Sequence, residues 1–143
     1  MLGVFSAMEV AASGLGAERV RMNTIAANLA NARTTRTEQG GAYRRIDPLF
    51  EAVGLDRSRP TVGRTGVSLV QVARIVQDER PGQMVYEPGH PDANGEGYVE
   101  YPNVNAVEEM VNMITASRAY EAGVTSIDTI KSMARSAIDL GRG

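Results

Sequence analysis

The sequence predicts an α+β protein in which two long terminal helices form a coiled-coil-like pair around a short, β-rich and loop-rich middle. Two observations lead to this prediction. All six prolines fall between Pro48 and Pro102, so both ends of the 143-residue chain lack the residue that most often breaks helices. Both ends also carry apolar residues at helical spacing. We therefore expect a helical part over 1–36 plus 103–143 and a β-rich part over 37–102.

The first helix is expected to begin at Ser6, where Ser6-Ala7-Met8-Glu9 forms a capping box for the free backbone N–H groups of a helix start. A coiled-coil-like row of apolar residues follows, which we expect to be buried between helices. Its members are Met8, Leu15, Met22, Ile25 and Leu29. Gly14 and Gly16 each cost an isolated helix about 1 kcal/mol relative to Ala. They indicate either a helix break or the close approach of a neighbouring helix.

Two asparagines lie near the expected end of this helix. Asn28 and Asn31 have side chains that can cap a helix end or bond to another subunit. Of these two roles, capping is favoured.

The last helix is expected to begin at Asn105, directly after Pro102, with Glu108 completing a variant capping box, and to run to about Leu140. A repeat of three and four residues from Met110 is mostly apolar, which favours a helix seam over a plain surface helix. The seam residues expected to be buried are Met110, Met113, Tyr120, Val124, Ile127 and Ile138. A second apolar stripe widens this face beyond what one partner helix covers, which indicates a bundle of several helices.

The length of the last helix bears on the shape of the subunit. About 35 residues at 1.5 Å per residue give a helix of roughly 50 Å, whereas a compact globule of this size is roughly 37 Å across. Either the helix is broken near Gly123, or the subunit is elongated and its ends need partners. We favour the elongated subunit, whose heterologous contacts would build chains or rings.

The middle of the chain is expected to hold short strands. Residues 67–77 are rich in β-branched side chains, and 97–101 form a shorter candidate. Residues 43–53 are a weaker candidate, because Pro48 restricts this segment to an edge strand or a bend.

Composition disfavours several classes of function. Fifteen basic and seventeen acidic residues are interspersed and give a net charge of −2, which indicates neither a nucleic-acid nor an anionic-lipid partner. The chain has no Cys, which excludes disulfides and thiolate metal sites. No apolar run approaches the length of a membrane span, and the first residues do not resemble a cleavable secretory signal. General secretion rules would then predict a cytoplasmic protein.

Candidate chemical sites are weak. His90 lies with Glu87 and Asp92 in a predicted loop, but a single Pro-flanked histidine is more often a surface residue than a metal ligand or acid–base group. Residues 92–97 begin like a calcium loop, yet Asn103 stands where the bidentate Glu belongs. No phosphate loop and no Gly-x-Ser-x-Gly motif occurs. We therefore expect no enzyme activity, no cofactor and no small-molecule substrate.

Two stretches resemble a known family. Residues 12–32, with the sequence ASGLGAERVRMNTIAANLANA, resemble the N-terminal signature of the bacterial flagellar rod and hook proteins. Two later segments, YEPGHPDA over 86–93 and YPNVNAVEEMVNMITASRAYE over 101–121, resemble the proximal rod members of this axial family.

The resemblance implies a structural subunit of the proximal rod of the bacterial flagellar basal body, which polymerises helically and transmits motor torque through the cell envelope. The implied partners are copies of itself, other rod proteins, and the membrane-ring, export-gate and bushing-ring components. The implied location is the periplasmic rod, reached by flagellum-specific type III export without a cleaved signal peptide. Two alternatives stay open, a soluble helical binding or adaptor module and an enzyme built around His90.

Overall fold

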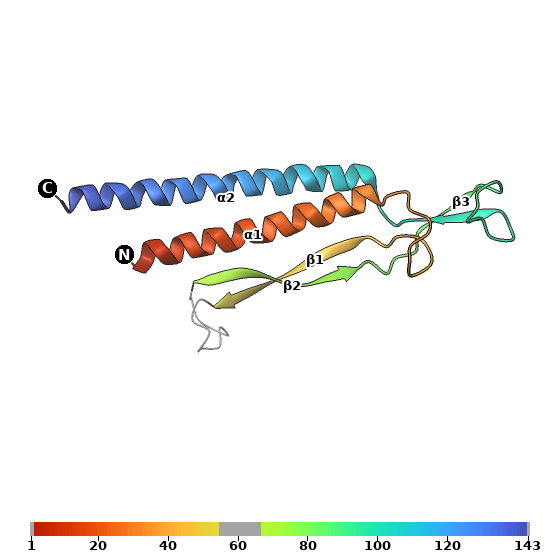
Figure 1. Ribbon diagram of the computed structural model, residues 1–143, viewed down its shortest axis with the longest axis horizontal. Coiled ribbons are helices and arrows are strands. Elements are labelled where there is room, and N and C mark those ends of the chain that lie inside the picture. Colours follow the sequence, from red (N-terminus) through yellow and green to blue (C-terminus); the bar gives the residue numbers. More distant parts are fainter. Residues whose placement is uncertain (1, 55–66, 143) are drawn as a thin grey trace.

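The computed structural model describes residues 2–54 and 67–142, which form two long helices and two small antiparallel sheets. Helix α1 (Leu2–Ala30) and helix α2 (Ala106–Leu140) lie side by side and run in opposite directions (Figure 1). The ribbon of β1 and β2 lies on the other side of α1, and β3 lies beyond the helices at one end of the molecule. The subunit is elongated, and the predicted α+β fold with two long terminal helices is confirmed.

Helix α2 begins and ends where the sequence predicts. The Asn105 side chain caps it, because its Oδ1 atom accepts hydrogen bonds from the backbone N–H groups of Val107 at 3.1 Å and Glu108 at 3.4 Å. The helix continues without interruption through Gly123 to Leu140. The alternative of a helix broken near Gly123 is therefore wrong, and neither helix of the described chain has an apolar stretch long enough to cross a membrane.

Helix α1 begins at Leu2, about one turn before the predicted start, so Ser6 lies inside the helix and is not its N-cap. Extending an existing helix gains one hydrogen bond per ordered residue, whereas starting a new one is unfavourable. Gly14 and Gly16 also lie inside α1 without breaking it, so the helix break that they could have indicated is wrong. A Cβ atom placed on either glycine would meet no other atom within 4 Å. Close approach there by a helix of another molecule stays a prediction.

The middle of the chain forms two separate pairs of strands. β1 (Ile46–Gly54) pairs with β2 (Ser68–Gln77), and β3 (Gln83–Tyr86) pairs with β4 (Tyr98–Tyr101). The strands predicted at β1, β2 and β4 are confirmed, while β3 was not predicted because only four residues separate two turn-rich segments. Pro48 lies within β1, just before a register shift between Leu49 and Phe50. A two-stranded ribbon has no central strand, so it tolerates a proline.

Helix α1 is the middle layer of the molecule. It contacts α2 on one side and both strands of the β1–β2 ribbon on the other. One of these contacts is a hydrogen bond from the backbone N–H of Val70 in β2 to Ser13 Oγ in α1, at 3.1 Å. Because α1 packs on two sides, its apolar residues are not confined to one narrow stripe. The division into a helical part and a β-rich part stays a prediction.

The face of α2 that packs against α1 follows a register that differs partly from the predicted one. One row of buried and half-buried residues alternates steps of four and three, and it consists of Glu109, Met113, Ala116, Tyr120, Gly123, Ile127, Ile130 and Ala134. It shares Met113, Tyr120 and Ile127 with the predicted seam. Met110, Val124 and Ile138 lie outside this row and are 55%, 40% and 47% exposed. Small side chains at Ala116 and Gly123 let α1 approach closely, which a search for large apolar residues does not reveal.

Replacing Gly123 with Leu is expected to destabilise the helix pair by about 1 to 3 kcal/mol, because the added atoms overfill a close contact. A Cβ atom at this position would already lie 2.7 Å from Leu15 Cδ2. The matched control is Gly123→Ala, whose single methyl group needs only a small shift of the flexible Leu15 side chain and gains about 1 kcal/mol of helix propensity. Urea unfolding followed by circular dichroism compares the two. A Leu variant as stable as the Ala variant would contradict the close approach.

Candidate assembly site

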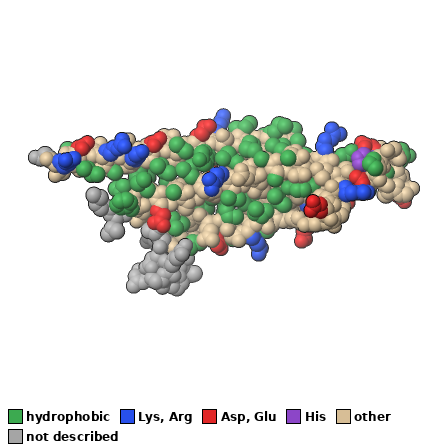
Figure 2. Space-filling model, in the orientation of Figure 1, with side chains coloured by type: hydrophobic (Ala, Val, Ile, Leu, Met, Phe, Trp, Pro, Cys, Tyr) green, Lys and Arg blue, Asp and Glu red, His purple; other side chains and the backbone are tan. Residues whose placement is uncertain are grey.

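Large apolar side chains remain exposed on both helices. Val107, Met110, Val111 and Ile114 of α2, which lie outside the row that packs on α1, are 71%, 55%, 58% and 56% exposed, and we call them the α2 outer patch. Phe5 of α1 is 66% exposed. Figure 2 shows hydrophobic side chains gathered over the helical part of the molecule, with charged side chains spaced among them. Contiguous exposed apolar surface of this kind marks a contact site for another molecule.

The structure separates the predicted interface residues into two groups. The first is buried or half-buried within the subunit, and it consists of Met8, Leu15, Met22, Ile25, Leu29, Met113, Tyr120 and Ile127. The second is exposed and consists of Met110, Val124 and Ile138. Only the second group leaves 40% or more of each residue's surface free for contact with a further molecule. That any of these residues contacts another subunit stays a prediction.

A buried polar cluster, which we call the polar junction, joins both helices to β1. Asn28 is 0% exposed and Glu109 is 1% exposed. Asn28 Nδ2 donates to Glu109 Oε2 at 3.2 Å and to the Ile46 carbonyl at 2.9 Å. Its Oδ1 accepts from the Ile46 backbone N–H and from the Tyr43 hydroxyl, each at 3.0 Å. An amide has two N–H donors and two acceptor lone pairs, so the hydrogen-bonding capacity of Asn28 is fully used.

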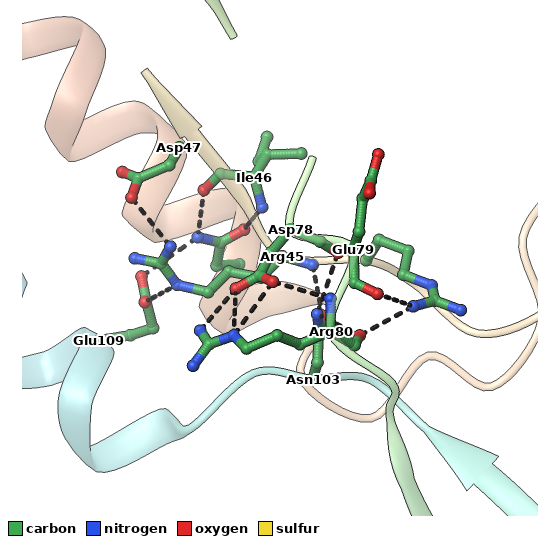
Figure 3. Close-up of polar contacts among 10 residues, drawn as sticks. Arg45, Ile46, Asp47, Asp78, Glu79, Arg80, Asn103 and Glu109 are labelled. Atoms are coloured by element: carbon green, nitrogen blue, oxygen red, sulfur yellow. Dashed lines mark hydrogen bonds and ion pairs between the residues drawn. The ribbon is translucent and has the colours of Figure 1, made fainter. Parts of the chain in front are cut away.

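Arg45 supplies the countercharge of the buried Glu109 carboxylate (Figure 3). Its Nε atom donates to Glu109 Oε1 at 2.7 Å, and an Nη atom donates to Asp47 at 2.9 Å. Burial acts to lower the pKa of Arg45, but these hydrogen bonds and charges outweigh it, and the pKa lies above its usual range. Burial and the Glu109 charge raise the pKa of Tyr43 against the opposing charge of Arg45, so its hydroxyl stays a donor to Asn28.

Asn103 extends the polar junction to the turn after β2. Its Oδ1 accepts from the Arg45 backbone N–H at 2.7 Å, while its Nδ2 donates to the carbonyls of Asp78 at 3.1 Å and Arg80 at 2.9 Å. Hydrogen bonds from the Arg80 side chain and backbone lower the pKa of Asp78 to about 2. Asn103 therefore ties the turn after β2 to the segment that leads into α2.

The two asparagines at the end of α1 have different roles. Asn31 Nδ2 donates to the Ala27 carbonyl at 2.9 Å, so this side chain satisfies a backbone group of the last turn. Asn28 was predicted to cap the helix or bond to another subunit, but its four hydrogen bonds instead run to β1, Tyr43 and α2 within the subunit. Sequence reasoning missed Arg45 and Glu109. The signal that could have found Glu109 is its position four residues before Met113, where the heptad pattern places an inward-facing side chain.

The three side chains of the conceivable metal or acid–base site bond to a backbone group or to side chains outside this trio. His90 Nδ1 accepts from the Asp92 backbone N–H at 3.1 Å, and Glu87 accepts from the Tyr101 hydroxyl at 3.1 Å. The Asp92 carboxylate pairs with Arg36 at 2.6 Å. Within residues 2–54 and 67–142, no three His, Asp or Glu side chains gather as a metal site.

Comparisons with known proteins match both terminal helices. Residues 8–36 match the family model described as flagella basal body rod protein, and 96–140 match the one described as flagellar basal body rod FlgEFG protein C-terminal. The flagellar basal-body rod protein FlgC of Borreliella burgdorferi is 44% identical over 99% of this chain and 100% of its own length. The FlgC of Bacillus subtilis is 38% identical over 96% and 98% of the two chains. That of Salmonella typhimurium is 37% identical over 99% and 100%.

Proposed function

The chain belongs to the family of flagellar basal-body rod proteins, which are structural subunits of the basal body, and on this basis we propose that it polymerises helically in the proximal rod and transmits motor torque. The observation that carries the proposal is the α2 outer patch. Its four side chains stay more than half exposed even though another face of α2 already packs on α1. A second helical partner is needed to bury them.

The small core of the subunit supports the same proposal. Among the described residues, the buried apolar residues of the helices are only Ala17, Ile25 and Ala116, which are 7%, 4% and 0% exposed. Most helix stability in proteins comes from packing an apolar face, because isolated helices are marginal in water. Contacts with neighbouring subunits would therefore supply much of the stability of the terminal helices.

The polar junction suits the transmission of torque. It connects α1, α2 and β1 through bonds that all pass through Asn28, Arg45 and Glu109. Buried networks with every group satisfied hold one arrangement rigidly. A twisting force on the β-rich part would therefore pass to both helices at this point and not be absorbed by a loose hinge.

The proposed partners and location follow from the family. The chain would contact copies of itself, other rod proteins, and the membrane-ring, export-gate and bushing-ring components. It would act in the periplasmic part of the basal body after export without a cleaved signal peptide, and it would not be an enzyme.

Replacing Val124 with Asp is expected to block assembly, because an unpaired charge buried in an apolar contact costs several kcal/mol. Val124 is 40% exposed in the subunit, so the isolated chain should still fold. The matched control is Ser126→Asp, which adds the same charge at an exposed polar position two residues further along α2. Swimming in soft agar and the amount of chain in purified basal bodies measure the effect. Normal swimming and normal incorporation of the Val124 variant would contradict the proposal.

A further inference from the structure

We propose that the α2 outer patch of one copy docks on α1 of a second copy of this chain that is displaced along the helix axis by about 11 residues, or roughly 16 Å. This inference rests on the proposed function, because it names the partner surface within the polymer. The receiving surface on α1 is a row of exposed and half-exposed residues, which we call the α1 outer stripe. It consists of Phe5, Glu9, Ala12, Gly16 and Arg19.

The two surfaces have complementary sizes of side chain. The α2 outer patch consists of large apolar residues, whereas the centre of the α1 outer stripe is Ala12 and Gly16. A Cβ atom on Gly16 would meet nothing within 4 Å, so the surface of α1 is open there. Small residues on one helix allow the large side chains of another to pack against its backbone. The stripe can therefore receive the patch without a clash.

The charges on the two surfaces have the same spacing. Glu9 and Arg19 lie ten residues apart on α1, and Glu108 and Arg118 lie ten residues apart on α2, with the acid first in both helices. All four are exposed, and none of their side chains makes an ion pair with another described residue. When two such helices run antiparallel, each acid can lie beside the base of the other helix.

Contacts within the subunit define the relative height of the two helices. Asn28 bonds to Glu109, and a Cβ on Gly123 would touch Leu15. Residues of α1 and α2 that lie at the same height along the helix axis therefore have residue numbers that add up to about 138. In a polymer of identically oriented copies, α1 of one copy also runs antiparallel to α2 of its neighbour. The same numbering then describes the contact between copies, apart from their displacement along the axis.

Two neighbouring copies at equal height would place like charges together. Arg19 would lie beside Arg118, and Glu9 would lie beside Asp128. When one copy is instead displaced by 11 residues along the helix axis, Arg19 lies beside Glu108 and Glu9 lies beside Arg118. One shift thus converts two repulsive contacts into two attractive ones, and electrostatic complementarity of this kind specifies register.

The same displacement also matches the apolar residues. Val111 then lies beside Gly16, and the exposed Phe5 ring lies beside Ala122. In both contacts a large side chain of one copy meets a small residue of the other. The charge pattern and the size pattern therefore select the same register.

Disulfide cross-linking tests this register, because the chain has no Cys of its own. Ala12→Cys and Thr115→Cys, co-expressed as two single-cysteine variants, are expected to form a cross-linked dimer in assembled rods. A disulfide requires Cα atoms within about 7 Å, which the displaced register allows at this pair. The matched control pairs Ala12→Cys with Thr125→Cys, which would be level only at equal height. Its yield is expected to be at least about ten-fold lower.

The outcomes separate this inference from the proposed function. A cross-link between positions 12 and 125, or assembled rods with no cross-link at either pair, would overturn the register while leaving a polymerising subunit. Failure of the unmodified chain to enter rods at all would overturn both.

Charge reversal provides a second test of the same contact. Glu9→Arg and Arg118→Glu are each expected to lower the yield of the 12–115 cross-link by about two- to five-fold, as for an exposed ion pair. The double variant restores opposite charges and is expected to recover the yield. Yields that neither single reversal changes would show that Glu9 does not lie beside Arg118.

Discussion

Replacing Arg45 with Met is expected to lower the free energy of unfolding of the subunit by about 3 to 5 kcal/mol, since it leaves a buried carboxylate without its countercharge. The Glu109 side chain is 1% exposed, and Arg45 Nε lies 2.7 Å from its Oε1 atom. Urea unfolding followed by circular dichroism measures the loss.

Two further variants make the Arg45 result specific. Asp47→Asn removes the other partner of Arg45, but the Asp47 side chain is 57% exposed, so its loss should cost no more than about 1 kcal/mol. The double variant Arg45→Met with Glu109→Leu removes both charges and is expected to recover part of the stability, because it relieves the unpaired charge but leaves one Asn28 N–H without its Glu109 acceptor. If Arg45→Met proved as stable as Asp47→Asn, the polar junction would not hold the helices to β1 as described.

Replacing Asn28 with Ala is expected to cost about 2 to 4 kcal/mol, because buried donors and acceptors lose their partner together. The side chain makes four hydrogen bonds, two of them to the backbone of Ile46 in β1. The expected loss is large for a single residue and should appear as a lower midpoint of urea unfolding.

Asn31→Ala is the matched control for Asn28. Asn31 is half-buried, donates to one carbonyl of its own helix and accepts from the Thr34 hydroxyl at 3.2 Å, so its replacement is expected to cost about 1 kcal/mol. Equal effects of the two substitutions would contradict the difference in their roles.

Local features of the sequence predicted the two ends of α2 correctly. They predicted the start of α1 less well. Asn105 caps the helix through backbone groups two and three residues away, so its role is visible in the sequence. The start of α1 was predicted too late, at Ser6, because the residue pattern of a capping box can also occur inside a helix that begins earlier. Family signatures in 12–32 and 101–121 predicted the function, which composition alone did not.

The packed face of α2 and the polar junction depended on information that no local pattern contains. The predicted seam contained Met110 and Val124 and not their neighbours Glu109 and Gly123, because large apolar residues usually mark a helix contact. Here a glycine lies at a close contact with Leu15, and the largest fully buried side chain is a carboxylate. The partners of that carboxylate, Asn28 and Arg45, lie 81 and 64 residues away in the chain.

Maleimide labelling of a Val111→Cys variant tests most directly whether neighbouring subunits cover the α2 outer patch. Val111 is 58% exposed in the subunit, so the isolated chain is expected to label rapidly. In assembled rods labelling is expected to slow by at least about ten-fold, because side chains in the centre of an interface lose contact with solvent. Complete labelling after denaturation serves as the control for the amount of thiol. Equal labelling rates in the isolated and assembled states would contradict the burial of this patch between subunits.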